Sequence, residues 1–225
     1  MTAMEKQAYA GLLRFMIGVA AAMFVTAWTL VYWQAWAFLA VFFGSSFATI
    51  RYLAKHDPKL LERRITAGPA AEKEQSQKLI QVLAMIAFFA MLLLPAIDRR
   101  YGWSSMSPSV AVAGDMLVAA GFVAIVFVFK ENSYASSIIE VGAGQKIVTT
   151  GPYAVMRHPM YSGAIVMLIG VPLALGSWWG LLTVIPLTLL IVWRLLEEEK
   201  FLIKNLPGYS EYQNKVRYRL LPFVW

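Results

Sequence analysis

Long apolar runs alternate with short polar segments along this chain. The apolar runs cover residues 11–33, 35–53, 79–97, 109–129, 160–175 and 181–196. Because a membrane-spanning helix needs roughly 20 apolar residues, the first four runs predict full spans. The last two hold about 16 residues each, which cover ~24 Å at helical rise. We expect these two to form a helical hairpin in the membrane, with both ends returning to one side.

The composition supports a membrane protein. Of the 225 residues, 59% are hydrophobic and 15% are charged, whereas soluble domains carry about 25% charged residues. We therefore predict an all-α integral membrane protein, a bundle of about six membrane-spanning helices. Since no linker separates two cores, residues 1–225 form a single membrane domain. The chain has no cysteine and only two histidines, His56 and His158, which argues against disulfides, thiol catalysis and a bound metal.

The positions of the basic residues predict the orientation of the chain. The net charge is +7, but the lysines and arginines lie at the ends of apolar runs, a pattern typical of membrane proteins rather than of nucleic-acid binding. With the N-terminus in the cytoplasm, all of the 20 basic residues except Arg99 and Arg100 fall on or near that side. The loop 51–78, the segment 130–158 and the C-terminal tail then share the cytoplasmic face.

Two polar segments on that face have local patterns of their own. In the loop 51–78, Asp57 and Pro58 predict the start of a short amphipathic surface helix. We interpret most charges of this loop as solvated surface. The tail from Glu197 to Tyr212 is amphipathic, and we expect it to lie at the membrane surface.

The densest group of candidate functional residues is Gly151-Pro-Tyr-Ala-Val-Met-Arg-His-Pro-Met-Tyr-Ser-Gly163. Pro159 suits the first turn of a helix, because that position needs no backbone donor. Arg157 and His158 would stand immediately before this helix, whose free N–H groups and dipole favour an anion. The alternative is a juxtamembrane anchor, with arginine and tyrosine at the depth of the lipid headgroups.

A second polar group, Glu197 to Glu199, follows the last apolar run. Three carboxylates at a helix C-terminus oppose the helix dipole, and each costs up to about 1 kcal/mol unless a cation compensates it. Arg194, Lys200 or a bound cation are candidates for this compensation. If the last two runs form a hairpin, the two polar groups are neighbours. The alternative is a solvated run of charges next to the membrane.

The combined pattern resembles a known family. The Gly-Pro-Tyr-x3-Arg-His-Pro-Met-Tyr-x-Gly element at 151–163, the pair Glu198-Glu199 followed by Phe201-Leu202, then Tyr209 and Tyr212, and finally Leu221-Pro222 are similar to the isoprenylcysteine carboxyl methyltransferases. The same pattern links that family to the phospholipid N-methyltransferases. The resemblance is strongest over residues 146–222, and Asp57-Pro-Lys-Leu-Leu-Glu-Arg63 is compatible with it.

The resemblance implies an S-adenosylmethionine site within residues 146–222. Arg157 and His158 are its candidate catalytic residues, and the cofactor-binding candidates are Tyr153, Arg157, His158, Pro159, Tyr161, Gly163, Glu198, Glu199 and Tyr209. The cofactor carboxylate suits Arg157 and His158, its ribose suits Glu198 or Glu199, and its sulfonium suits the tyrosines. Whether Arg157 and His158 orient the cofactor or the acceptor stays open.

The predicted function is therefore that of a membrane-embedded methyltransferase with its active site facing the cytoplasm. The resemblance implies a lipophilic acceptor, which is isoprenylcysteine-like, a lipid amine or a thiol, and it implies neither nucleic acid nor metal as a partner. One alternative is an NADPH-dependent sterol or steroid reductase, because Val216-Arg-Tyr-Arg-Leu-Leu-Pro222 fits the C-terminal pattern of those enzymes. Another is a non-catalytic membrane scaffold. The double Glu followed by Phe-Leu favours the methyltransferase.

Overall fold

A computed structural model describes residues 1–142 and 144–225, and its long elements are helices. Five described helices are long and apolar enough to cross a membrane: α1 (Ala3–Ala27), α2 (Trp33–His56), α4 (Gln75–Tyr101), α5 (Pro108–Glu131) and a continuous helical stretch made of η2 (Trp179–Thr183) and α7 (Val184–Asn205). A shorter apolar helix, α6 (Pro159–Ala174), lies between α5 and η2 in the chain. This architecture confirms the prediction of an all-α, multi-pass integral membrane protein.

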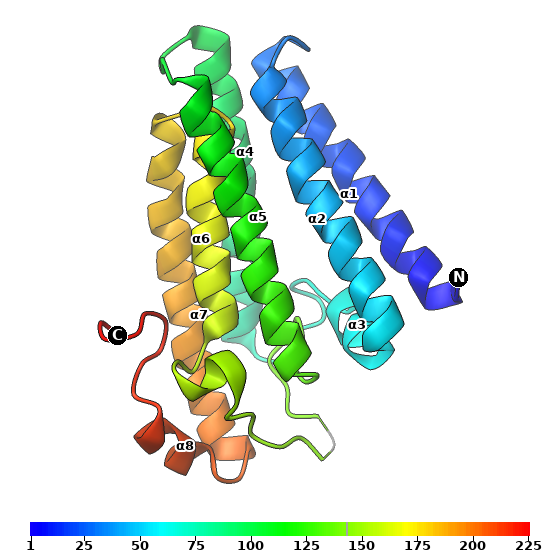
Figure 1. Ribbon diagram of the computed structural model, residues 1–225, viewed down its shortest axis with the longest axis vertical. Coiled ribbons are helices and arrows are strands. Elements are labelled where there is room, and N and C mark those ends of the chain that lie inside the picture. Colours follow the sequence, from blue (N-terminus) through cyan, green and yellow to red (C-terminus); the bar gives the residue numbers. More distant parts are fainter. Residues whose placement is uncertain (143) are drawn as a thin grey trace.

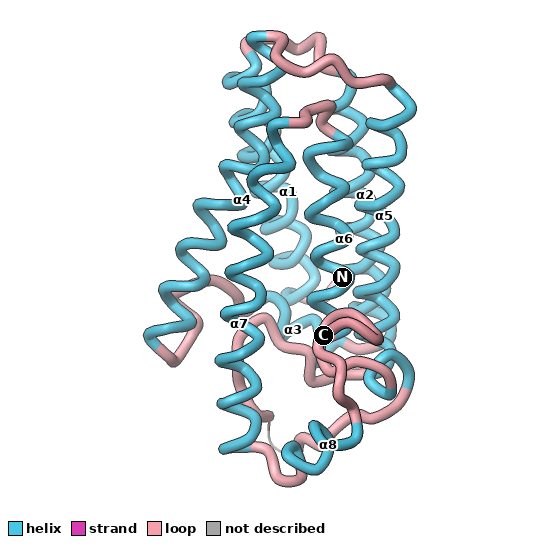
Figure 2. Tube along the Cα trace, turned by 90° about the vertical axis from the view of Figure 1, so that its left-hand side faces the viewer, coloured by secondary structure: helices cyan, strands magenta, loops and turns pink. Residues whose placement is uncertain are grey.

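The helices form a bundle with its short polar elements at one end. Helices α4 to α7 run side by side, and α1 and α2 lie along one flank (Figure 1). The short helices α3 (Pro58–Ile65) and α8 (Tyr209–Lys215) lie at the lower end of the bundle, together with the loop that follows α5 (Figure 2). The α1–α2 and α4–α5 connections lie at the opposite end. The segments predicted to share the cytoplasmic face are thus together in space.

The short helix α3 forms as the loop sequence predicts. Pro58 is its first residue, and the Asp57 side chain caps it by accepting a hydrogen bond from the Leu60 N–H at 3.0 Å. Its Leu60 and Leu61 are buried against α2 and α5, in one cluster with Leu53 and Phe129. This packing holds α3 against the base of the bundle, so its remaining side chains reach the end of α5.

Several predicted boundaries are wrong. The first apolar run was placed at 11–33, but α1 covers Ala3–Ala27 and α2 already begins at Trp33. The third apolar run was expected to end at residue 97, but α4 continues through Pro95 to Tyr101. The membrane tolerates a proline within a helix, and the turns beyond it are held by buried Asp98, whose carboxylate accepts hydrogen bonds from Ser104 and Ser177. The sixth run was expected to end at 196, but α7 continues to Asn205. Residues 197–205 are therefore a rigid extension of the span, and the tail begins after them.

Helices α5 and α6 approach each other closely enough for their backbones to touch. A Cβ atom on Gly114 would lie 2.2 Å from the Ala174 nitrogen, and one on Gly121 would lie 2.7 Å from the Gly163 oxygen. Such small residues allow helices to pack closely in a membrane. Gly163 is therefore a packing residue of this pair. The contact fixes the start of α6 relative to the end of α5.

The orientation of the bundle can be tested with single cysteines, because the chain has none of its own. Ser105 is exposed in the α4–α5 connection, and Ser210 is exposed on α8 at the opposite end. We expect Ser105→Cys to react with a membrane-impermeant maleimide added outside intact cells. The matched variant Ser210→Cys should react only after the cells are permeabilised. The reverse labelling pattern would contradict a cytoplasmic site.

Candidate active site

A single buried carboxylate joins the start of α6 to the end of α7. Glu199 is 4% exposed. Its Oε1 lies 2.8 Å from Arg157 Nε and 3.2 Å from His158 Nε2, and its Oε2 accepts a hydrogen bond from Arg219 Nε at 3.0 Å. The side-chain Nε–H of Arg157 is not aligned on that oxygen and has no hydrogen-bond partner among the described residues. The two polar groups predicted to be neighbours are thus in direct contact.

The C-terminal segment completes this ion cluster by running alongside the residues that precede α6. The backbone N–H of Arg157 donates to the Tyr218 carbonyl at 2.9 Å, and the backbone N–H of His158 donates to the Arg219 carbonyl at 3.0 Å. The Ser162 hydroxyl donates to the Leu220 carbonyl at 2.6 Å. These bonds position Arg219 for its contact with Glu199. They also occupy two N–H groups at the start of α6, so an anion here would meet side chains rather than those two amides.

A cavity of about 470 Å³ opens beside the ion cluster, within the range of ~300–1,000 Å³ typical of small-ligand sites. Six of the predicted site residues line it: Tyr153, Arg157, His158, Tyr161, Glu198 and Tyr209. The other three do not. Pro159 begins α6, Gly163 packs on α5, and Glu199 lies behind Arg157 and His158.

The adjacent glutamates therefore have different surroundings. Both carboxylate oxygens of Glu199 contact basic side chains, whereas Glu198 lines the cavity and is half-buried. The Tyr161 hydroxyl donates to Glu198 Oε2 at 2.7 Å. Among the described residues, no donor is bonded to the other Glu198 oxygen. Glu198 thus presents a carboxylate oxygen that a ligand hydroxyl could reach.

Tyrosines form a second part of the cavity wall. Asn132 donates to the Tyr153 hydroxyl at 2.9 Å, and the Tyr212 hydroxyl donates to the Tyr153 carbonyl at 2.8 Å. The rings of Tyr209 and Tyr212 lie 5.8 Å apart. Burial raises the pKa of Tyr153 to about 12 and raises those of Tyr209 and Tyr212 further. These side chains are neutral phenols at physiological pH, suited to contact a cation through their ring faces.

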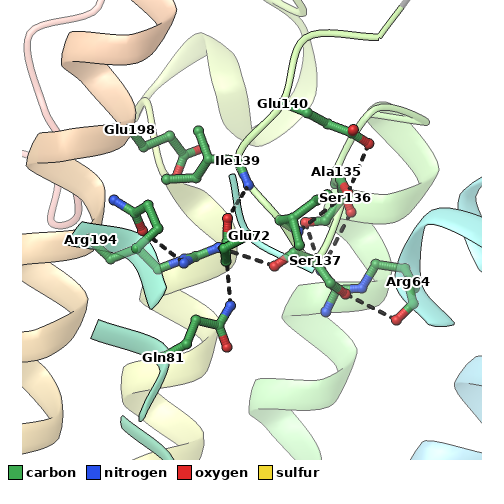
Figure 3. A network of polar contacts seen from close by, with 12 residues as sticks. Arg64, Glu72, Gln81, Ala135, Ser136, Ser137, Ile139, Glu140, Arg194 and Glu198 are labelled. Carbon is green, nitrogen blue, oxygen red and sulfur yellow. Dashed lines mark hydrogen bonds and ion pairs between the residues drawn. The ribbon is translucent and has the colours of Figure 1, made fainter. Parts of the chain in front are cut away.

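A separate polar network closes another side of the cavity (Figure 3). Glu72, from the loop before α4, is 3% exposed and pairs with Arg194 of α7 at 2.8 Å. Arg194 also donates to Gln77 at 2.9 Å and to the Ser137 carbonyl at 3.0 Å. Gln81 donates to Glu72 at 2.9 Å. The network ties the loop and the segment after α5 to the helix that carries Glu198.

Most charged residues of the loop 51–78 are exposed, as the sequence indicated, but two of them are exceptions. Glu72 is buried, and Arg64 lines the cavity. Arg194, a candidate to compensate the three glutamates, pairs with Glu72, while Lys200 pairs with Glu197 at 2.7 Å. The sequence contained no local signal for the Glu72–Arg194 pair, because its partners are far apart along the chain. Asn132 and Tyr212 were missed as cavity residues for the same reason.

The ion cluster predicts a large difference between neighbouring glutamates. Glu199→Gln leaves Arg157 and Arg219 without their counter-charge, and breaking a buried pair costs about 3–5 kcal/mol. Glu197→Gln removes an exposed pair worth at most about 1 kcal/mol. In thermal unfolding of the detergent-purified protein, we expect Glu199→Gln to lower the Tm by about 6–20 °C and Glu197→Gln to leave it nearly unchanged. Equal shifts would contradict a structural role for Glu199.

Comparison with known proteins shows similarity to methyltransferases. The family model of the phospholipid methyltransferases matches residues 110–207, which include α6, α7 and all but the first two residues of α5. The chain is also similar to proteins named "Probable protein-S-isoprenylcysteine O-methyltransferase" from Oryza sativa subsp. indica and subsp. japonica. Each is 26% identical over 207 residues, covering 85% of this chain and 97% of the relative. These matches confirm the predicted resemblance, and they relate this membrane protein to the isoprenylcysteine carboxyl methyltransferases and the phospholipid methyltransferases.

Proposed function

We propose that this protein is an S-adenosylmethionine-dependent methyltransferase whose donor site is the cavity between α6, α7 and the C-terminal tail. The observation that carries the proposal is the composition of that cavity. It combines a carboxylate with an open oxygen at Glu198, neutral tyrosine rings, and the basic side chains of Arg157 and His158. The residues come from 146–222, the region with the strongest family resemblance.

These residues fit the chemistry of the donor. Glu198 is suited to accept hydrogen bonds from the ribose hydroxyls, and Glu199 fixes Arg157 and His158 beside the cavity, where they suit the donor carboxylate. The rings of Tyr153, Tyr209 and Tyr212 suit a sulfonium cation. When bound, S-adenosylmethionine supplies an activated methyl group that an acceptor nucleophile takes in a single displacement, releasing a neutral thioether.

The residues of the chain contribute positioning and desolvation to such a reaction. Holding two reactants in line accounts for a large part of the rate of a bimolecular displacement, and excluding water strengthens each polar contact inside the site. The ion cluster around Glu199 and the Glu72–Arg194 network fix the walls of the cavity from two sides. No side chain has to form a covalent intermediate, so a chain without cysteine is compatible with the chemistry.

The apolar part of the cavity supports a lipophilic acceptor. Met160, Ala164 and Met167 lie three or four residues apart on α6 and all line the cavity, as does Ile125 of α5. This spacing places them on one face of the helix, extending the cavity from the polar end of the bundle towards its apolar middle. We propose that an acceptor with an apolar tail enters sideways from the lipid, while its head is methylated on the cytoplasmic side.

The alternative, a nicotinamide-dependent reductase, rested on the segment Val216–Pro222. In this chain the carbonyls of Tyr218, Arg219 and Leu220 are hydrogen-bonded to residues at the start of α6. That segment therefore has a structural role here that requires no nicotinamide, and the two comparisons favour methyl transfer.

Calorimetric titration of the detergent-purified protein tests the donor. We expect S-adenosylmethionine to bind and NADPH not to bind. Glu198→Gln should weaken S-adenosylmethionine about 10- to 100-fold, because a hydrogen bond to a charged group is worth about 1.5–3 kcal/mol. Glu197→Gln is the matched control and should keep the affinity of the wild type. NADPH binding in place of S-adenosylmethionine, or equal affinities in both variants, would refute the proposed site.

A further inference from the structure

Arg64 on α3 has an unusual set of partners at the edge of the cavity. Its Nη1 lies 3.4 Å and 3.2 Å from the carbonyl oxygens of Ala135 and Ser136, and 3.7 Å from Met160 Sδ. Its guanidinium lies 5.1 Å from the centre of the Phe129 ring. All hydrogen bonds from its guanidinium to described residues involve Nη1, and its main-chain carbonyl accepts one from the Ser137 hydroxyl at 3.0 Å. Its Nε and Nη2 make none, yet they are not among the fully buried polar atoms without a partner. Arg64 lines the cavity, so these two nitrogens are the guanidinium donors that remain for a ligand there.

Arg64 lacks the carboxylate partner that the other two arginines of the cavity wall have. Three arginines line the cavity: Arg64, Arg157 and Arg194. Arg157 pairs with Glu199 and Arg194 pairs with Glu72, but no carboxylate in the described residues forms an ion pair with Arg64. Burial lowers the pKa of Arg64 to about 10, an effect that nearby Tyr161 opposes, so the side chain remains charged at neutral pH. A partly desolvated cation without a counter-charge is costly, and a bound anion would remove that cost.

The position of Arg64 indicates which ligand would supply the anion. Its guanidinium contacts Met160, the first residue of the apolar face formed by Met160, Ala164 and Met167. A ligand with its tail along this face would bring its polar head to Arg64. The side chains suited to the donor carboxylate, Arg157 and His158, are instead grouped around Glu199.

We propose that Arg64 binds the anionic group of the methyl acceptor, a carboxylate or a phosphate carried on an apolar tail, and thereby selects acceptors with that charge. The inference rests on the proposed function, because it assigns the acceptor side of the same cavity.

The neighbouring Arg63 offers a matched control. It also donates to a loop carbonyl, that of Ser133 at 2.7 Å, and lies 4.9 Å from the Tyr134 ring centre, but it does not line the cavity.

The test uses two pairs of lipophilic ligands, and in each pair only one ligand carries the anionic group. The first pair is an S-prenylated cysteine and its carboxamide, and the second is phosphatidylethanolamine and a long-chain amine without phosphate. The affinity of each ligand, and separately that of S-adenosylmethionine, is measured for the wild type, Arg64→Gln, Arg64→Lys and Arg63→Gln. Thermal unfolding of each variant establishes that it is folded, and Arg64→Lys keeps the positive charge if the glutamine variant is unstable.

In at least one pair, the wild type should prefer the anionic ligand, and that pair identifies the source of the anion. Arg64→Gln should weaken this ligand about 10- to 100-fold and remove the preference, with S-adenosylmethionine affinity unchanged. Arg64→Lys should retain part of the preference, and Arg63→Gln should retain all of it. A wild type without preference in either pair, a preference that survives Arg64→Gln, or a loss of S-adenosylmethionine affinity instead would overturn the proposal. Absence of S-adenosylmethionine binding in the wild type would refute the proposed function itself.

Discussion

The arrangement at the polar end of the bundle depends on compensating the charge of Glu199. A buried carboxylate is stable only when cations and hydrogen bonds replace its hydration, and here Arg157, His158 and Arg219 come to it from two separate parts of the chain. This requirement brings the start of α6, the end of α7 and the C-terminal segment to one point. Residues of α6 and α7 line the cavity beside that point, so its shape depends on the same contacts.

The second constraint is the close packing of α5 on α6. Because Gly114, Gly121 and Gly163 allow backbone contact, the segment that leaves α5 begins beside the residues that precede α6. The carbonyls of that segment then receive donors from Arg64 and Arg194. Glu72 completes the wall from the loop before α4. Adjacent acidic residues consequently serve different purposes: Glu199 holds the structure together, and Glu198 remains open to a ligand.

The sequence predicted the parts of this protein that depend on local pattern. Apolar run length gave the spans, and Pro58 and Pro159 marked the starts of two helices. The spacing of Arg157, His158 and the glutamates indicated a meeting point of the last two spans. The sequence did not predict the Glu72–Arg194 pair or the role of Arg64, because a charge in a polar loop has the same local pattern whether it is solvated or buried. The roles of Glu198 and Glu199 were likewise indistinguishable, since only the helix orientation separates adjacent side chains.

The central claim is that the methyl donor binds in the cavity bounded by α6, α7 and the tail. It is tested most directly by ultraviolet cross-linking of radiolabelled S-adenosylmethionine to the membrane-embedded protein, followed by mapping of the labelled peptides. We expect label within residues 146–212, around Tyr153, Glu198 and Tyr209, and competition by S-adenosylhomocysteine. Competable label confined to α1 and α2, the helices remote from the ion cluster, would contradict it.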